Sequence, residues 1–372
     1  MEGKKNQFNP LGLSNSNDKL LIAGPCSAET EAQTIETALQ MAGCGVTIFR
    51  AGAWKPRTRP GGFEGKGQEA LKWIKLAGKV ANLPVITEVA TPEHVRLALE
   101  AEIDMLWIGA RTSVNPFAMQ EIAEALKGVD VPVFVKNPIN PDLELWIGAL
   151  ERLSSAGVRR IAAIHRGFST YETVLYRNKP NWEIPIELKR LFPGLTVLCD
   201  PSHISGSRDS VGAIAQNALD LNFDGLMIEV HCRPDEALSD KKQQLSPAGF
   251  KKLLGGLVYR KEKIEDVLAN TFVEELRATI DKIDDKIIEY IAQRMDLARV
   301  IGLHKREHNV TILQKDRWDE VVKTRTDLGV NKDLNAAFVL RLFELIHQEA
   351  IFHQDVVMNQ NTAITPKTTQ QV

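Results

Sequence analysis

The segments 196-TVLCDPSH-203 and 225-GLMIEVH-231 are the clearest markers of the fold, because each is a short apolar run that ends in side chains able to do chemistry. Helical stretches separate them from six similar segments: 20-LLIAGPC-26, 46-VTIFR-50, 84-PVITEV-89, 105-MLWIGAR-111, 131-VPVFVKN-137 and 159-RRIAAIHR-166. A strand–helix unit repeated eight times is typical of a (β/α)8 barrel, the TIM barrel, whose active site gathers at the carboxyl ends of the strands. The charged groups at almost every strand end indicate an enzyme for strongly anionic substrates.

The composition excludes several other classes of protein. A chain of 372 residues with 44% hydrophobic and 25% charged residues predicts a globular protein of about two domains. The net charge of −2 argues against nucleic acid and membrane surfaces as partners. No apolar run approaches the ~20 residues of a membrane span, and residues 1–18 lack the apolar core of a signal peptide. The four cysteines do not form a disulfide pattern, which is typical of proteins in a reducing compartment. We therefore expect a cytoplasmic protein.

The sequence pattern changes after the eighth strand segment. We expect a flexible arm at 1–17, the barrel at 18–256, a charged linker at 257–270, an all-α domain at 271–356 and a disordered tail at 357–372. Apolar residues recur at helical spacing over 271–306, and further helices are expected at 313–328 and 333–355.

Two groups of side chains gather at the predicted strand ends. A thiolate, an imidazole and two carboxylates make a workable ligand set for a divalent metal ion, and they occur here as Cys26, His203, Glu229 and Asp240. Phosphate and carboxylate groups are held by Arg and Lys, and these cations are Lys55, Arg57, Arg111, Lys136 and Arg166. A structural role for each metal-type residue and a solvated rim for the cations are the alternatives.

Nine short motifs follow one another within residues 20–254: AGPCSAE (23–29), FRAGAWKPRT (49–58), ITEV (86–89), IGAR (108–111), VFVK (133–136), IHRG (164–167), DPSH (200–203), IEVH (228–231) and ALSD (237–240). This series resembles the metal-dependent 3-deoxy-D-arabino-heptulosonate 7-phosphate (DAHP) synthases, and in particular the compact subgroup that also resembles 3-deoxy-octulosonate synthases. The resemblance implies condensation of phosphoenolpyruvate with erythrose 4-phosphate at a divalent metal ion. Manganese is the expected ion, with iron, cobalt and zinc left open.

The same resemblance implies a role for each residue of the site. The metal ligands would be Cys26, His203, Glu229 and Asp240. Phosphoenolpyruvate would be held by Arg111, Lys136 and Arg166. Erythrose 4-phosphate would meet Lys55, Arg57 and Thr58, with Lys55 close to both substrates. Further substrate-binding residues are expected to be Arg50, Asp200 and Ser202. Two candidates for orienting or deprotonating the water that adds to phosphoenolpyruvate are Glu88 and His165, and a structural hydrogen bond is the alternative for each.

Cations interrupt the apolar stripe of the long predicted helix. Arg294 lies in the stripe that Ile287 and Ile301 mark. Lys305 lies within ~20° of Arg294 and roughly 16 Å further along the axis, so the two need an anion between them. Arg277 is rotated by ~100° from Arg294 and lies about 25 Å away, so it would reach a ligand only in the site of another subunit. This geometry predicts a homodimer with shared sites.

The run ELRATIDKIDDKIIEYIAQRMDLARVIGLHK (275–305), followed by DRW (316–318) and RLFELIHQEAIFHQ (341–354), resembles the all-helical chorismate mutases. Their rearrangement of chorismate to prephenate needs only a pocket that fits the chair-like conformer and stabilises the negative charge at the breaking bond. The resemblance implies that Arg294 and Arg317 hold the substrate carboxylates. Lys305 and Gln354 would face the ether oxygen, and Arg277 would come from the partner chain.

The sequence departs from this pattern at Gln314 and Trp318, where acidic residues near the ring hydroxyl are expected. Two alternative readings of the chain stay open. The barrel can be a 3-deoxy-octulosonate 8-phosphate synthase, and the helical domain can be a non-catalytic module for regulation and dimerisation. We also expect chorismate or prephenate, bound in the helical domain, to inhibit the barrel, because the fusion joins a domain for a downstream metabolite to the committing step. Pairing of dimers into tetramers is a further open point.

Overall fold

The computed structural model describes residues 8, 11, 19–55, 61–171 and 175–359. The chain divides into two compact units, residues 1–262 and 263–372. The first unit confirms the predicted barrel, since eight parallel strands pair in sequence order and close on each other. The strands are β1 Leu20–Gly24, β2 Ile48–Arg50, β3 Val85–Val89, β4 Met105–Ile108, β5 Val133–Lys136, β6 Ile161–His165, β7 Thr196–Cys199 and β8 Gly225–Glu229.

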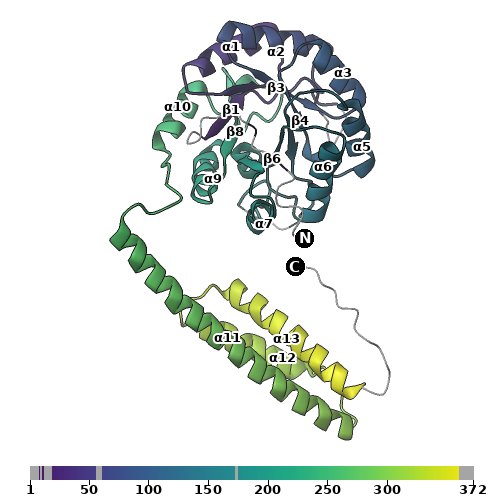
Figure 1. The fold of residues 1–372 in the computed structure, drawn as a ribbon, viewed down its shortest axis with the longest axis vertical. Helices are drawn as coiled ribbons and strands as arrows, with labels where there is room; N and C mark the ends of the chain where they lie inside the picture. Colours follow the sequence, from purple (N-terminus) through teal and green to yellow (C-terminus); the bar gives the residue numbers. More distant parts are fainter. Residues whose placement is uncertain (1–7, 9–10, 12–18, 56–60, 172–174, 360–372) are drawn as a thin grey trace. The chain divides into compact units, whose positions relative to one another are not determined.

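Helices form a ring around the strands (Figure 1). They are α1 Glu31–Ala42, α2 Gln68–Ala81, α3 Pro92–Glu100, α5 Pro116–Ala125, α6 Leu143–Ser155, α7 Glu183–Leu191, α9 Arg208–Asp220 and α10 Pro247–Gly256. Three shorter elements follow the strand ends, and these are α4 Ala110–Ser113, α8 Pro201–Ser205 and the 3-10 helix η1 Pro234–Glu236. Arg111 and His203 therefore lie on short helices after β4 and β7 rather than on the strands themselves.

The apolar core of the barrel has two parts, because successive side chains of a strand point to opposite faces. One part fills the barrel and includes Ile48, Trp107 and Ile164. The other lies between strands and helices, and it includes Phe49 and Trp146. This alternation decides which residue at a strand end can face the interior. In the segment expected to be a flexible arm, Phe8 and Leu11 are buried, and the ring of Phe8 packs edge-on against that of Phe192 at 5.2 Å.

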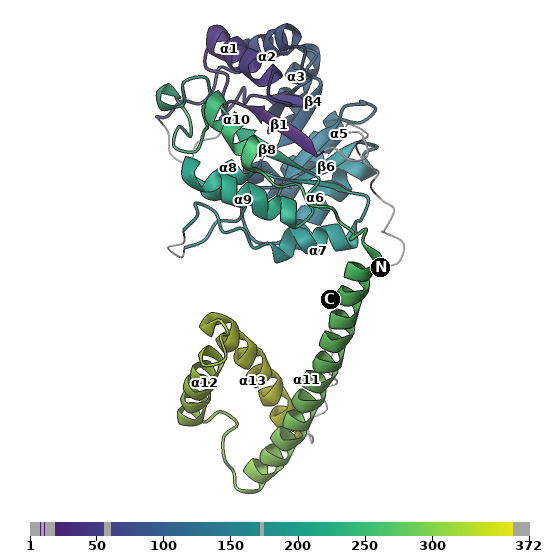
Figure 2. The ribbon, with the colours of Figure 1, turned by 90° about the vertical axis from the view of Figure 1, so that its left-hand side faces the viewer.

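In the second unit the described residues, 263–359, form three helices. They are α11 Val267–Glu307, α12 Lys315–Val330 and α13 Ala336–Met358, and α13 packs against both α11 and α12. Figure 2 shows how α12 and α13 follow the long α11. Helix α11 begins at Val267, inside the segment expected to be a linker, because the Asp266 carboxylate accepts a hydrogen bond from the backbone N–H of Ala269 and caps the helix there. Among the described residues, no helix combines the length and apolar composition of a membrane span.

Candidate active sites

A pocket of about 130 Å³ opens at the carboxyl ends of the barrel strands. Most of its lining residues come from the strand ends that the sequence singled out, and the full set is Lys55, Glu88, Gly109, Ala110, Arg111, Lys136, Arg166, Arg177, His203 and Asp240. Several cations thus share one small space with two carboxylates and an imidazole. Such a pocket suits ligands that carry more than one negative charge.

Three of the expected metal ligands lie together beside this pocket. One ligand atom from each of Cys26, Glu229 and Asp240 lies within 4.8 Å of the others, and Cys26 Sγ lies 3.4 Å from Asp240 Oδ2. The fourth, His203, has Nε2 at 3.8 Å from Glu229 Oε1. Asp240 has a φ of 44°, in the left-handed region, which is uncommon for a residue with a side chain and is found at functional sites.

The chemistry of this group fits a divalent cation. Burial, with the neighbouring Glu229 carboxylate, raises the pKa of the Cys26 thiol to about 12. A buried thiol and two carboxylates crowded together repel one another when charged, and a metal ion reverses that preference by stabilising thiolate and carboxylate together. Sulfur, nitrogen and oxygen donors suit manganese, iron, cobalt or zinc.

Two residues expected to bind substrate instead support this group. The Asp200 Oδ2 atom accepts a hydrogen bond from Lys136 Nζ at 2.6 Å, and His203 Nδ1 lies 2.8 Å from the same oxygen. Ser202 Oγ accepts the backbone N–H of Glu229 at 2.9 Å. Both residues are fully buried and do not line the pocket among the residues described. Their contacts orient His203 and Glu229, in the way that outer hydrogen bonds orient metal ligands.

Sequence reasoning missed two further residues of this network. Gln243 Nε2 donates to Glu229 Oε2 at 2.7 Å, and its Oε1 accepts from Arg177 Nη1 at 2.9 Å. Arg177 Nη1 also donates to Asp240 Oδ1 at 3.1 Å. Both residues come from loops, where no periodic pattern marks them.

The expected substrate cations converge on the pocket. Lys55, Arg111, Lys136 and Arg166 all line it. Arg166 Nη1 donates to Asn178 Oδ1 at 2.9 Å, and burial lowers the pKa of Arg166 to about 10, which leaves the guanidinium charged at neutral pH. Arg57 and Thr58 lie outside the described residues.

Arg50 lies deeper, inside the barrel. Its Nη2 donates to Glu229 Oε1 at 3.1 Å, and its guanidinium carbon lies 4.8 Å from the centroid of the Trp107 ring. Its Nε and Nη1 have no hydrogen-bond partner among the described residues. Buried donors of this kind usually find a partner in water or a ligand.

The two candidates for handling water differ in position. Glu88 lines the pocket, and its Oε2 accepts the indole N–H of Trp107 at 3.1 Å. His165 follows the inward-facing Ile164 on β6 and therefore points outward, where its ring lies among those of Trp146, Phe168, Trp182 and Phe223. Burial lowers the pKa of His165 to about 3. A neutral imidazole in the helix layer does not face the pocket, so the geometry gives His165 a packing role.

The helical unit brings several of its expected residues to one face. Arg294 is half-buried, and its Nη1 donates to the carbonyl of Ile346 at 3.4 Å. Lys305 Nζ donates to the carbonyl of Ile312 at 2.6 Å. Gln354 is buried, and its Oε1 has no partner among the described residues. Burial, together with Arg317 and Arg325, lowers the pKa of Arg294, so these cations share one field. That field is suited to an anion.

Arg277 and Arg317 differ from these residues in exposure. Arg277 is exposed and pairs with Glu274 at 2.6 Å, and Arg317 pairs with Glu320 at 2.5 Å. Gln314 is exposed at the start of α12, and Trp318 stacks on His347 at 4.0 Å between ring centroids. His347 is a residue of this face that sequence reasoning missed.

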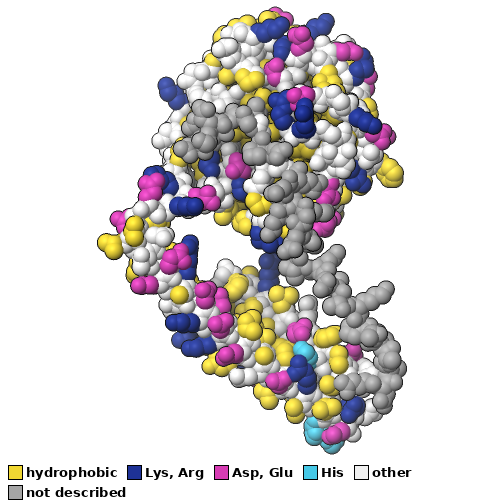
Figure 3. Space-filling model, in the orientation of Figure 1, with side chains coloured by type: hydrophobic (Ala, Val, Ile, Leu, Met, Phe, Trp, Pro, Cys, Tyr) yellow, Lys and Arg dark blue, Asp and Glu magenta, His cyan; other side chains and the backbone are white. Residues whose placement is uncertain are grey.

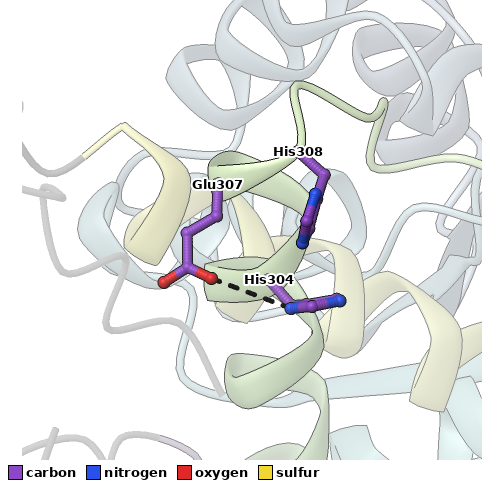
Figure 4. Close-up of side chains that lie close together, drawn as sticks. All are labelled: His304, Glu307 and His308. Atoms are coloured by element: carbon purple, nitrogen blue, oxygen red, sulfur yellow. Dashed lines mark ion pairs between the residues drawn. The ribbon is translucent and has the colours of Figure 1, made fainter.

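A second group of metal-type side chains lies at the end of α11 and is exposed. Figure 4 shows His304, Glu307 and His308, with His304 Nδ1 at 3.7 Å from Glu307 Oε2. All three come from one helix end, and the cations Lys305 and Arg306 stand between His304 and Glu307 in the sequence. These three side chains are exposed, whereas the barrel group brings a buried thiol and a buried carboxylate together, so the barrel group is the better metal candidate.

Known proteins supply a family for each part of the chain. The model of the DAHP synthetase I family matches residues 9–265, and that of chorismate mutase type II matches residues 276–355. The phospho-2-dehydro-3-deoxyheptonate aldolase of Thermotoga maritima is 32% identical over 248 residues, which cover 67% of this chain and 70% of that protein. The 2-dehydro-3-deoxyphosphooctonate aldolase of Desulfatibacillum aliphaticivorans is 30% identical over 262 residues, which cover 64% of this chain and 90% of the relative.

Solved structures agree with the sequence matches. The crystal structure of the Thermotoga maritima aldolase, a DAHP synthase, matches with a TM-score of 0.59 at 31% identity and covers 64% of this chain and 68% of that chain. A truncated DAHP synthase from the same organism matches with a TM-score of 0.57 at 29% identity, covering 64% of this chain and 85% of that one. The chain therefore belongs to the DAHP synthetase I family, as an enzyme with a DAHP synthase barrel followed by a chorismate mutase type II domain.

Proposed function

We propose that the barrel condenses phosphoenolpyruvate with D-erythrose 4-phosphate to give DAHP and phosphate, and that the helical unit rearranges chorismate to prephenate. The observation that carries the first half is the pocket, in which four of the cations expected from the sequence lie next to the thiol–carboxylate group: Lys55, Arg111, Lys136 and Arg166. Two phosphorylated substrates repel each other in water. Fixed cations offset this repulsion and hold the reacting carbons in place.

Side-chain type supports the division of substrates among these cations. Arg111 and Arg166 offer planar forks to the phosphate and carboxylate of phosphoenolpyruvate. Lys136 adds a point charge that Asp200 holds at 2.6 Å. Lys55 would lie close to both substrates. Erythrose 4-phosphate would also meet Arg57 and Thr58. Arg50 is a substrate-binding candidate too, because two of its buried nitrogens lack a partner among the described residues.

The proposed metal ligands are Cys26, His203, Glu229 and Asp240, with manganese as the ion. Members of this family generally depend on a metal. A divalent ion held by these groups would act as a Lewis acid on the aldehyde oxygen of erythrose 4-phosphate. The hydrogen bonds from Gln243 to Glu229 and from Arg177 to Asp240 would orient two of the ligands.

The reaction makes one carbon–carbon bond and one carbon–oxygen bond, the latter to water, and it breaks the carbon–oxygen bond to phosphate, while the oxygen of the aldehyde gains a proton. C3 of phosphoenolpyruvate attacks the aldehyde carbon, water adds to C2, and phosphate leaves from the same carbon. Lys55 would stabilise the negative charge that develops on the aldehyde oxygen. Glu88 lines the pocket, and its carboxylate would orient the water and take its proton.

The mutase half rests on the cation face of the helical unit. Arg294 and Arg317 would hold the two carboxylates of chorismate. Lys305 and Gln354 would stabilise the charge on the ether oxygen. Gln354 would do so through Nε2, whose hydrogen bond to the carbonyl of Ala350 is long, at 3.4 Å. No bond to the protein forms and no proton moves, so positioning and electrostatics supply the rate.

We further propose that two chains pair through the helical unit. Large apolar side chains line its exposed surface (Figure 3), and on α11 they include Leu276, Ile280, Ile283 and Ile287. The last three are between 47% and 55% exposed, which is unusual for a stripe at helical spacing unless another surface covers it. The partner's α11 is the proposed cover, and it would bring Arg277 to the site of the other chain.

Two smaller proposals concern the boundary between the domains and the location of the protein. The barrel domain would end, and the helical domain begin, near the boundary of the compact units at residues 262 and 263. The proposed ligand Cys26 and the other three cysteines are free thiols, which fits a reducing cytoplasm.

A single experiment tests the synthase and its proposed control. Loss of phosphoenolpyruvate is followed with manganese and erythrose 4-phosphate while prephenate is titrated into the full chain. Consumption that falls as prephenate rises supports both the synthase and feedback through the helical unit. Consumption that ignores prephenate and chorismate contradicts the feedback. Faster consumption with arabinose 5-phosphate than with erythrose 4-phosphate contradicts the proposed aldehyde, a comparison that the octonate aldolase relatives make necessary.

A further inference from the structure

His347, on α13, carries a polar atom that the fold buries without a partner. Its Nε2 is shielded from solvent and makes no hydrogen bond among the described residues. Gln354 Oε1, on the same helix, is in the same condition. The two residues are seven positions apart, which places them within ~20° of one direction on the helix. One face of α13 thus presents two uncommitted buried polar atoms, and buried polar atoms are normally paired.

The ring of His347 has a fixed orientation. It stacks on the indole of Trp318 from α12, with 4.0 Å between ring centroids and 13° between the planes. Such a stack buries one face of the imidazole and leaves its edge, where the nitrogens lie, to make directional contacts. Trp318 is also one of the two positions at which the chain departs from the expected acidic residues.

The surroundings keep the imidazole uncharged. Burial lowers the pKa of His347, and the nearby cations Arg294 and Lys305 lower it further. At neutral pH the ring is therefore a neutral group, with one nitrogen that donates and one that accepts. It is a poor partner for a carboxylate compared with the cations beside it. It is a good partner for an uncharged hydroxyl.

We propose that His347 binds the ring hydroxyl of chorismate through Nε2, with Trp318 holding the imidazole in place. This inference rests on the proposed mutase function of the helical unit. Chorismate carries two carboxylates, an ether oxygen and one hydroxyl. The cations and Gln354 account for the first three. His347 Nε2 is left for the hydroxyl, because it is buried without a partner among the described residues, whereas Gln314 is exposed.

The test uses two variants and two substrates in the full chain. His347→Leu removes the hydrogen bond and keeps an apolar side chain, whereas His347→Gln offers an amide nitrogen near the position of Nε2. The substrates are chorismate and its analogue without the ring hydroxyl. For chorismate, His347→Leu should lower kcat/KM about 10-fold, the size of one lost hydrogen bond in a buried site, and His347→Gln should recover part of that loss. For the analogue, wild type and His347→Leu should be equal. The matched control is His304→Leu, at an exposed histidine. This variant should leave kcat/KM unchanged for both substrates.

The possible outcomes distinguish a failure of this inference from a failure of the proposed mutase function. Equal losses with both substrates make His347 a structural residue and overturn the proposal. An unaffected His347→Leu variant overturns it as well, while leaving the mutase function intact. A wild-type chain that does not turn over chorismate contradicts the mutase function itself. Circular dichroism of each variant identifies any loss that comes from unfolding.

Discussion

One amide, that of Gln243, holds two of the proposed metal ligands in place. It donates to Glu229 directly, and it accepts from Arg177, which in turn donates to Asp240. Gln243→Leu breaks both links while keeping the volume of the side chain. Because outer hydrogen bonds of this kind are worth ~10–100-fold in metal affinity, the variant should need correspondingly more manganese for half-maximal synthase activity.

Two further variants serve as references for the manganese affinity of Gln243→Leu. Cys26→Ala removes a ligand and should lose bound metal and most activity, whereas Gln120→Leu, on the exposed face of α5, should behave as wild type. Metal content after dialysis gives a readout that is independent of turnover. A Gln243→Leu variant that binds manganese as tightly as wild type would remove Gln243 from the site.

Gln243 also shows where sequence reasoning ends. The strand-end residues were predictable, because a barrel brings every carboxyl strand end to one face. Lys55, Glu88, Arg111, Lys136 and Arg166 all reach the pocket for that reason. Gln243 and Arg177 come from loops, and their contact spans 66 residues, so no local pattern marks them. A strand end also has an outward side, as the buried His165 shows.

The buried imidazole of His165 makes the barrel sensitive to acid. The unfolded chain binds a proton there with an ordinary pKa of about 6.5, whereas burial lowers the pKa in the folded barrel to about 3. Above pH 6.5 neither state is protonated, and the group contributes nothing. Below it only the unfolded state gains the proton, so stability falls by ~1.4 kcal/mol per pH unit until the pH nears the folded value.

His165→Phe should remove this term. Between pH 7 and pH 5 the wild type should lose about 2 kcal/mol more of its unfolding free energy than the variant loses. Urea unfolding followed by tryptophan fluorescence measures the difference, since Trp318 is the one tryptophan outside the barrel. Equal losses in the two proteins mean that His165 is protonated, or paired, in the folded barrel.

At the scale of elements, the packing of α11 against α13 depends on Gly302. A Cβ at this position would lie 2.6 Å from Val357 Cγ2 and 3.0 Å from the Cα of Gln354. Alanine gains about 1 kcal/mol of helix propensity over glycine, but overpacking against a backbone atom costs typically ~1–3 kcal/mol. The clash should win, and α13 should shift away from α11.

Gly302→Ala should therefore lower mutase activity, because α13 carries Gln354. We expect a loss of at least about 10-fold in kcat/KM, with synthase activity measured without prephenate unchanged. The control is Gly148→Ala on α6, where a Cβ meets only Arg152 Nη1 at 3.9 Å. There the propensity gain acts alone and should stabilise the barrel slightly. A Gly302→Ala chain with full mutase activity would show that the two helices can adjust.

The elements themselves followed the sequence closely, and their ends did not. Apolar runs predicted all eight strands, but 105–111 and 196–203 end as short helices, because Gly109 and Asp200 start new helical turns there. The Asp266 cap likewise starts α11 earlier than its apolar periodicity does. Periodicity reports which face is buried, whereas helix ends depend on single capping contacts.

At the scale of the whole molecule, the proposed dimer makes each mutase site a product of two chains. Arg294 and Arg277 would then reach one ligand from different subunits. Two inactive chains, Arg277→Ala and Arg294→Ala, can test this directly. In a mixed dimer one site carries both changes and the other carries neither.

Equal amounts of the two chains, unfolded together and refolded, should recover about a quarter of wild-type mutase activity, since about half of the dimers are mixed and each has one intact site. Each variant refolded alone should stay inactive. Adding Ile280→Glu and Ile287→Glu to both chains should abolish the recovery, because buried carboxylates on the apolar stripe separate the protomers, and light scattering should then report the mass of one chain. Variants that dimerise but never complement would place Arg277 and Arg294 on one chain's own site. That outcome would contradict a mutase site shared between two chains, although the apolar stripe would still account for the dimer.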